Sequence, residues 1–467
     1  MLDITYKQYL IGNPKCAVQG MKEFPVSEEV RIYAGEGLRV VKGVTKGGVP
    51  YWLLGEAYCA NVYPREAVED LNSDTNGDIF VITRYWTGRW VLIFGNELIT
   101  DACGLMSAFY HKGNEGWVIS SSLALMSKQH GQTITKKVAI SGLTWQLLPA
   151  SIIDSVKTLF CTQRMTLNQE LEITFFNRFE EWKGLTSEQR VSTITNSLKT
   201  SLKNIEKFSN CKIWVALTAG KDSRLTFAAA LASGVHFETY TASHRNLSDA
   251  DRHLPEKISK KYGVTHHMLK PEPFSKSRCD DYCAFTGYNS SGADAEFYAS
   301  GQFDQIPIDA ISIKSGLFEA GQTYARSISG GEEETFISGI RNYYKTSFKD
   351  EGQVVAFNEW LDYQRNNSML GIDIRDRFYL EQRLNGWASS IEQSLSINPF
   401  VTIQIANSAV VLGCLLYASS EDRECLRLSY DLIRNLDEGL LKYPVNQRTI
   451  GDEVRIILKG LKKRLHL

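Results

Sequence analysis

The chain has 467 residues, too many for one hydrophobic core, and its 43% hydrophobic and 22% charged residues are ordinary for a globular protein. Lys and Arg total 52 and Asp and Glu total 53, so the formal net charge of -1 argues against nucleic acid or an anionic membrane as a partner. No run approaches the ~20 apolar residues of a membrane-spanning helix. Nine scattered cysteines, an odd number, and an N-terminus unlike a signal peptide lead us to expect a cytoplasmic protein.

Residues 1–185 are expected to form a β-rich domain, because short apolar runs alternate with turn residues. Residues 80–84 and 89–94 flank a short turn at 86–88, and this spacing predicts a hairpin. Further strands are predicted at 30–34, 51–54 and 117–121.

The hydrophobic period changes after residue 185. Residues 187–205 carry apolar side chains at helical spacing, with Ser187 as the expected N-cap. Strands and helices then alternate, an order that indicates a parallel sheet with right-handed crossovers, and we place a second domain over 186–467. Its predicted elements are strands at 212–217 and 237–241, helices at 222–231 and 250–262, a buried helix at 409–418 and a mostly helical region beyond 335.

The junction between the first predicted strand and helix of this second domain indicates an anion site. Its residues are small, so backbone amides can approach a phosphate, and the helix N-terminus adds partial positive charge. A carboxylate at Asp222 would repel a bare phosphate, but it fits a magnesium ion held between protein and pyrophosphate. The residues expected to bind nucleotide here are Thr218, Ala219, Gly220, Lys221, Asp222 and Ser223.

This loop resembles the Ser-Gly-Gly-x-Asp-Ser loop of the N-type ATP pyrophosphatases, with Thr218 and Ala219 in place of the first two residues. The wider resemblance is to the asparagine synthetase family, through further motifs in the same order. It implies ATP and Mg²⁺, with Glu319 as the second magnesium carboxylate. The motifs are Thr241 to Ser243 at the nucleotide, the Gly-Val-Thr-His-His run at 263–267, the loop at 315–324 with Gly316 and Glu319, and the segments 375–383 and 398–400.

The N-terminal half resembles the glutaminase domain of the same family, in the segments 88–93, 101–110 and 119–125. The resemblance implies an α/β protein built from an Ntn-hydrolase-like β-rich sandwich and a parallel-sheet ATP pyrophosphatase domain with added helices. That glutaminase uses an N-terminal cysteine whose free amine is the base. Here residue 2 is Leu2, so we expect a scaffold without glutaminase activity.

The implied reaction is adenylation of a carboxylate on a small molecule or peptide, followed by attack of an amine or ammonia, as in relatives similar to β-lactam synthetases and lasso-peptide cyclases. Glu381 and Lys442 are candidates by position for a catalytic role, as is Tyr379. Each has a structural alternative: a core aromatic for Tyr379, an ion pair with Arg377 or Arg383 for Glu381, and a surface charge for Lys442. A homodimer is compatible with the resemblance.

Two other functions compete with the ligase. One is a non-catalytic relative that binds nucleotide or a protein, favoured by Ala219 and Leu2. The other is a pyrophosphatase acting on RNA, disfavoured by the lack of basic character. The adjacent His266 and His267 invite a metal site, but neighbouring strand residues face opposite ways, so at most one could face it.

Overall fold

The structure is a computed structural model that describes residues 3–13, 16–72, 78–114, 116–130, 134, 143–243, 247–290, 292–323 and 332–445. Leu2 and residue 324, which closes the predicted glycine-rich loop, lie outside these ranges. Among the described residues, no helix combines the length and apolar character needed to cross a membrane.

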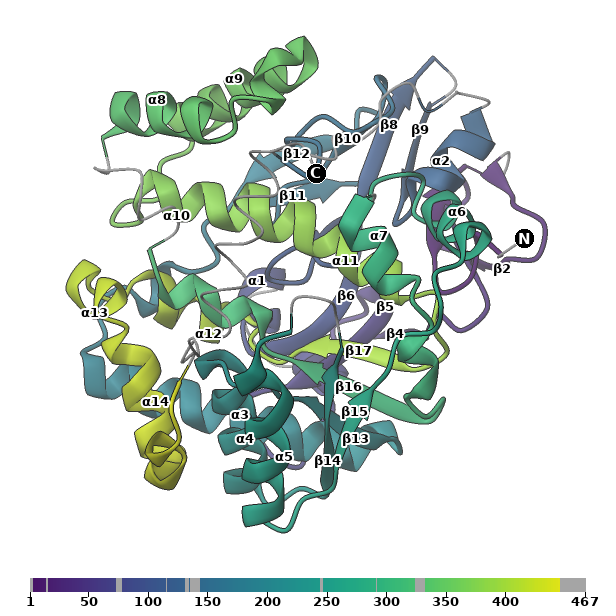
Figure 1. Ribbon diagram of the computed structural model, residues 1–467. Helices are drawn as coiled ribbons and strands as arrows, with labels where there is room; N and C mark the ends of the chain where they lie inside the picture. Colours follow the sequence, from purple (N-terminus) through teal and green to yellow (C-terminus); the bar gives the residue numbers. More distant parts are fainter. Residues whose placement is uncertain are drawn as a thin grey trace.

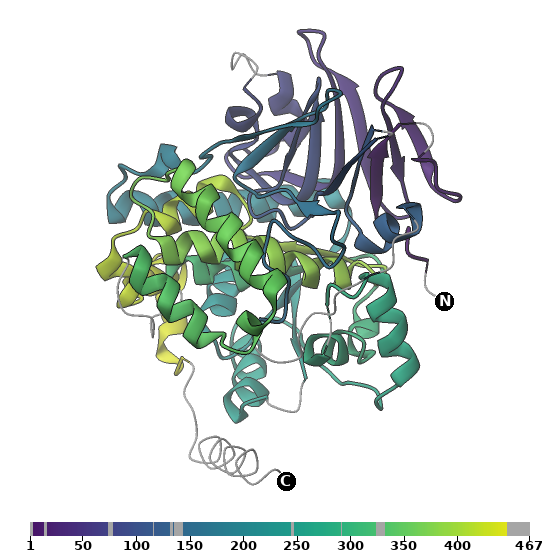
Figure 2. The ribbon, with the colours of Figure 1, turned by 90° about the horizontal axis from the view of Figure 1, so that it is seen from above.

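Two antiparallel sheets pack face to face in the N-terminal part, shown in purple to blue in Figure 2. Their inner faces share a core in which Ile11, Ile32 and Ile119 of one sheet meet Leu54 and Val91 of the other. The strand order in the first sheet, over the described residues, is β10 (Lys157–Thr158), β8 (Phe109–Gly113), β9 (Gly116–Ser120), β1 (Tyr9–Gly12), β3 (Arg31–Ala34) and β2 (Lys22–Pro25). The order in the second sheet is β12 (Glu172–Phe175), β11 (Gln163–Thr166), β7 (Glu97–Thr100), β6 (Trp86–Phe94), β5 (Pro50–Cys59) and β4 (Val40–Val44).

The predicted hairpin at 80–94 is wrong. Its first arm is the short helix α1 (Ile79–Thr83), whose N-cap Asp78 accepts the amide of Phe80 at 2.9 Å. Its second arm, β6, begins at Trp86 and pairs instead with β5, in a register that places Leu54 opposite Val91. A short run of buried apolar residues has no period that separates strand from helix, so only the partner strand decides.

A five-stranded parallel sheet forms the centre of the C-terminal part (Figure 1), and the predicted α/β class is confirmed. One face packs Ile213, Val215 and Ile313 against the helices α3 (Ser187–Ser209), α4 (Lys221–Ser233) and α12 (Ala409–Leu416). The other face packs Trp214 and Tyr240 against α11 (Ser389–Leu395) and η4 (Gln302–Gln305), which is the period-2 alternation of a buried sheet. In order across the sheet, the described strands are β15 (His266–Leu269), β14 (Phe237–Ala242), β13 (Lys212–Ala216), β16 (Ala310–Lys314) and β17 (Val401–Gln404).

The helices of this part follow the predicted order, with one correction. The cap of α3 is Thr186 and not Ser187, because Thr186 and Gln189 form a capping box. Helical elements over the described residues are η2 (Ala67–Asn72), α2 (Leu123–His130), η3 (Glu180–Trp182), α3 (Ser187–Ser209), α4 (Lys221–Ser233), α5 (Asp249–Lys261), α6 (Lys276–Phe285), α7 (Gly292–Tyr298), η4 (Gln302–Gln305), η5 (Gly316–Gly321), α8 (Glu333–Tyr343), η6 (Ser347–Lys349), α9 (Glu351–Asn366), α10 (Ile374–Phe378), the π-helix η7 (Tyr379–Ala388), α11 (Ser389–Leu395), α12 (Ala409–Leu416), α13 (Ser420–Glu424), α14 (Arg427–Asp437) and η8 (Glu438–Lys442).

The sandwich and the parallel sheet are joined by buried polar contacts. The side-chain amide of Asn407, just after β17, donates to the Gly88 carbonyl of β6 at 2.5 Å and to Asp101 at 2.8 Å, and its oxygen accepts the amide of Cys103 at 3.0 Å. Thr87 donates to the carbonyl of Ile405 at 2.9 Å. These bonds hold β6 beside β17, so the sandwich covers one edge of the region where the parallel strands end.

Candidate functional site

The site lies at the carboxyl edge of the parallel sheet. The chain leaves β13 toward β14 on one side, and β16 lies on the other, so the strand order reverses at β13. Open parallel sheets bind ligands at such a switch point, outside the carboxyl ends of the strands. The predicted phosphate loop follows β13 directly, and η5, which carries Glu319, follows β16.

The loop after β13 is shaped by its own hydroxyl groups. The Ser223 hydroxyl lies 2.9 Å from that of Thr218 and accepts the Thr218 amide at 3.0 Å, while the Thr218 hydroxyl accepts the amide of Gly220 at 3.1 Å. Gly220 is the N-cap of α4, and no side chain caps the helix. The first amides of α4 therefore have no side-chain cap, which is the arrangement that an anion site at a helix N-terminus requires.

Asp251 was not predicted, yet it touches the loop. Its carboxylate accepts the amide of Ala219 at 2.8 Å and the hydroxyl of Ser248 at 2.6 Å. Ser248 is the N-cap of α5, and the Ser-x-x-Asp spacing of 248–251 is the local signal that could have identified this residue. One loop amide is thus already bonded to a carboxylate.

The two acidic residues expected to hold magnesium both lie near Tyr379. Glu319 accepts the Tyr379 hydroxyl at 3.0 Å. Burial raises the pKa of Tyr379 well above its usual value, and the negative charges of Glu319 and Asp222 raise it further. Asp222 lies on the first turn of α4 and Glu319 lies on η5, and because these two elements pack against each other, the fold brings both acids to the same region.

Asp222 has a partner of its own. Lys221, whose side chain is 5% exposed, donates to it at 2.5 Å. Burial raises the pKa of Asp222, while the adjacent ammonium lowers it. Lys221 is thus a buried lysine paired with the partly buried carboxylate of Asp222, and its charge favours the ionised form of that carboxylate.

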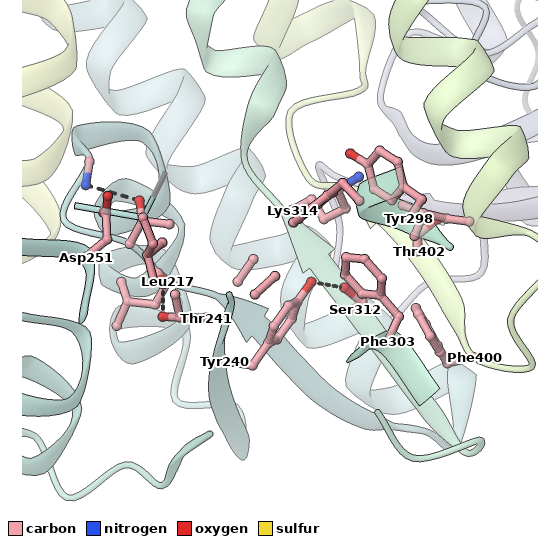
Figure 3. A pocket seen from close by; sticks show the side chains of 17 residues that line it. Leu217, Tyr240, Thr241, Asp251, Tyr298, Phe303, Ser312, Lys314, Phe400 and Thr402 are labelled. Carbon is pink, nitrogen blue, oxygen red and sulfur yellow. Dashed lines mark hydrogen bonds between the residues drawn. The ribbon is translucent and has the colours of Figure 1, made fainter. Parts of the chain in front are cut away.

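A cavity of about 360 Å³ opens beside the loop, within the range of small-molecule sites (Figure 3). The carboxyl-end residues of β13, β14 and β16 form its floor, where the Tyr240 hydroxyl lies 2.7 Å from that of Ser312. Its lining residues are Ala216, Leu217, Thr218, Gly220, Tyr240, Thr241, Ala242, Leu247, Asp251, Phe297, Tyr298, Phe303, Ser312, Lys314, Leu395, Phe400 and Thr402.

Three of the predicted nucleotide residues, Thr218, Gly220 and Thr241, line this cavity. The Thr241 hydroxyl donates to the Leu217 carbonyl at 2.6 Å and so fixes the backbone directly before the loop. Ser243 and Gly316 lie at the same edge of the sheet but not in the cavity lining. The Gly316 amide donates to Gln404 at 2.9 Å.

Glu381 lies away from this cavity, in a fully buried polar cluster. Its carboxylate accepts hydrogen bonds from Thr162 at 2.6 Å, from Trp360 and Arg377 at 3.0 Å each, and from Gln364 at 2.5 Å. The ion pair with Arg377 is the structural alternative considered for this residue. A carboxylate so enclosed and so fully bonded cannot reach a substrate, and the structure gives no support to a catalytic Glu381.

Lys442 is exposed on η8, and the structure ties this element to the loop through an arginine that the sequence did not indicate. Arg224, on the first turn of α4, is 0% exposed. Its guanidinium donates to the carbonyls of Ala219, Leu440, Tyr443 and Pro444 at 3.1, 3.2, 2.8 and 3.0 Å. The segment around Lys442 is therefore held beside the start of α4, while the ammonium of Lys442 faces solvent.

The donors present fit a magnesium ion that is shared with a nucleotide. Within the described ranges, no three His, Cys, Asp or Glu side chains gather into a closed metal site. Mg²⁺ takes one or two carboxylates and completes its shell with phosphate oxygens and waters, a set that Asp222 and Glu319 suit. His266 and His267 are engaged elsewhere, with Thr239 at 3.0 Å and Glu238 at 2.5 Å.

No family model matches the sequence, and no curated protein matches it. Among solved structures, the chain shows a likeness to glutamine phosphoribosylpyrophosphate amidotransferase from B. subtilis complexed with ADP and GMP, at 9% identity and a TM-score of 0.22, over 57% of this chain and 85% of that one. A structure of the allosteric regulatory enzyme of purine biosynthesis matches at 7% identity and a TM-score of 0.24, over 73% and 74%.

Proposed function

We propose that this chain is an ATP-dependent ligase that releases AMP and pyrophosphate, activating a substrate carboxylate and joining it to an amine or ammonia. The observation that carries the proposal is the start of α4, where the N-cap Gly220 lines the 360 Å³ cavity, no side chain caps the helix, and Asp222 follows in the first turn. Free amides, a helix N-terminus and an adjacent carboxylate suit a magnesium-bound triphosphate better than a simple anion.

In the proposed complex, the adenosine lies in the cavity over the ends of β13 and β14, and the β- and γ-phosphates lie against residues 218–223. The substrate carboxylate attacks the α-phosphorus, the bond from that phosphorus to the α–β bridging oxygen breaks, and pyrophosphate leaves with the electron pair. An amine then attacks the acyl carbon, AMP leaves, and the amine loses a proton. Free ammonia or an amine on the substrate supplies the nitrogen.

The residues of the loop act on the charge of the leaving pyrophosphate. In this proposal the amides of α4 bind the pyrophosphate without reorganising as charge develops, and Lys221, which donates to Asp222, adds positive charge nearby. A magnesium ion bound by Asp222 and Glu319 would neutralise part of that charge. Tyr379, a phenol kept protonated by burial and by the two acids, orients Glu319.

The test is exchange of labelled pyrophosphate into ATP, measured over a panel of carboxylates with the wild-type chain and Asp222→Asn. The amide keeps the shape of the side chain but removes its charge. We expect carboxylate-dependent exchange in the wild type and a loss of about 100-fold or more in the variant, the cost of one charged transition-state contact. Equal exchange in both proteins would remove Asp222 from the metal site.

The second candidate is a nucleotide-binding or interaction protein without catalysis. One observation favours it: the Ala219 amide, Asp222 and Glu319 each already have a partner in Asp251, Lys221 and Tyr379. Binding of ATP with no exchange for any carboxylate in the panel would decide for this alternative.

A further inference from the structure

The cavity has two ends with different chemistry, as Figure 3 shows. Leu217, Thr241 and Asp251 lie at one end, beside the phosphate loop. Lys314 lies at the other end, near Tyr298 and Thr402. The first end bears a carboxylate and the second an ammonium, so the cavity is polarised along its length.

Lys314 is a cation that the fold turns toward the cavity. It donates to Glu392 at 2.8 Å, and the side chains of the pair are 19% and 1% exposed. Glu392 also accepts Thr402 at 2.6 Å and Gln404 at 2.9 Å. Burial alone would raise the pKa of Glu392, but Lys314 and these donors bring it below its usual value. The anion is thus sealed behind the cation, and the ammonium has N–H bonds left, since the described residues supply it with one acceptor.

The position of Lys314 on the sheet places it next to the phosphate loop. In the parallel ladder Val215 of β13 lies opposite Ile313, so Lys314 is level with Ala216, two residues before Thr218. Ser312 and Lys314 share the cavity face of β16, while Ile311 and Ile313 face the core. A carboxylate on Lys314 would therefore lie close to the α-phosphate of a nucleotide in the loop.

The walls around Lys314 are aromatic and preassembled. Phe303 packs edge-on against Phe297 with ring centroids 5.5 Å apart, and stacks on Tyr298 at 5.7 Å. Phe400 and Leu395 complete this end of the cavity. Burial of a flat apolar ligand against these aromatic walls is favourable, whereas a second charged group on the ligand would find few polar partners there.

We propose, on the basis of the proposed function, that this end of the cavity takes a carboxylate with a flat apolar body and that Lys314 receives the carboxylate group. The ligase substrate is then an aromatic or similarly apolar acid rather than a small dicarboxylic amino acid. The anion would meet Lys314 and stay apart from Asp251, which fixes its direction in the cavity.

The experiment measures binding to the full chain by calorimetry, with 3-phenylpropionate and with 3-phenylpropanamide, which has the same shape and no charge. Lys314→Met alone would leave Glu392 buried and unpaired, so the main variant is Lys314→Met with Glu392→Gln, which removes both charges together. Lys212→Met is the matched control, because Lys212 is the exposed lysine at the opposite end of neighbouring β13, paired with Asp309. Binding of a fluorescent ATP analogue is measured for each protein.

We expect the wild type and Lys212→Met to bind the carboxylate at least about tenfold more tightly than the amide, and the double variant to lose this preference. Binding of the ATP analogue by the wild type and by Lys212→Met shows that the nucleotide site is intact. A preference that survives in the double variant, or is absent from a wild type that binds ATP, overturns the inference and leaves the ligase proposal standing. A wild type that binds no ATP analogue overturns both.

Discussion

The hydroxyl of Tyr379 donates a hydrogen bond of 3.0 Å to the carboxylate of Glu319, sixty residues earlier in the chain. The tyrosine is 3% exposed and held by the core, whereas Glu319 is exposed, so the hydrogen bond from Tyr379 restrains the position of the Glu319 carboxylate. A core aromatic is the structural alternative that the sequence offers at this position. The structure makes it a core aromatic whose polar end reaches the site, a common use of buried tyrosine.

Tyr379→Phe should weaken magnesium use without unfolding the protein. Glu319 would lose its orienting donor, and we expect the Mg²⁺ concentration for half-maximal pyrophosphate exchange to rise about three- to tenfold, near 1 kcal/mol. Tyr363→Phe is the control, since it also removes one hydroxyl, in contact with Thr162 at 2.9 Å and not with the site. An unchanged Mg²⁺ requirement in Tyr379→Phe would separate the phenol from the metal.

Glu381→Gln should lower stability and leave activity intact, whereas Glu319→Gln should abolish activity and leave stability intact. Glu381 is buried among four donors, so the amide should lower the free energy of unfolding by about 3 kcal/mol, with exchange per folded molecule unchanged. Glu319 is exposed, so its amide should change stability by less than about 0.5 kcal/mol yet abolish exchange. Urea unfolding and pyrophosphate exchange, both measured on the same samples, distinguish the two roles. A stable, inactive Glu381→Gln would restore its catalytic role.

His266 should make the protein sensitive to acid. Burial, and then the charge of His267, lower the pKa of His266 from 6.5 to about 4. Between these values the unfolded chain binds the proton first, so the stability due to neutral His266 is complete above pH 6.5 and is lost as the pH falls toward 4. We expect a contribution of about 1–2 kcal/mol after solvent screening.

The measurement for His266 is urea unfolding at pH 7 and pH 5. His266→Gln should show a smaller loss of stability between the two than the wild type. His253→Gln, at an exposed position on α5, should behave as the wild type. A wild-type slope retained in His266→Gln would show that other groups cause the acid sensitivity.

Arg224→Met should destabilise the fold by about 3 kcal/mol or more. The change leaves four carbonyl oxygens without the donor that joins Ala219 to the segment 440–444, and unsatisfied buried acceptors are costly. Arg252→Met, at an exposed position on α5, should lie within about 0.5 kcal/mol of the wild type in urea unfolding. A loss below about 1 kcal/mol in Arg224→Met would mean that water replaces the guanidinium.

The strand, loop and helix over 212–233 could be predicted from the sequence because their causes are local. Apolar residues of β13 run directly into small loop residues, and the hydroxyls of Thr218 and Ser223, five residues apart, bond to each other. The helical spacing of α3 and the buried run of α12 were recognisable for the same reason. The prediction failed in the sandwich, where α1 is too short to show a period, and by one residue at the start of α3, where Thr186 is the cap.

Tertiary structure alone decided which polar groups meet. Asp251 reaches the Ala219 amide across 32 residues, Lys314 reaches Glu392 across 78, and Glu381 is enclosed by Thr162, 219 residues away. A carboxylate therefore bonds a loop amide in Asp251, pairs with a partly buried lysine in Glu392 and joins core side chains in Glu381. Which of these an acid becomes depends on burial and on the donors that the fold brings to it, and neither is encoded in its immediate neighbours.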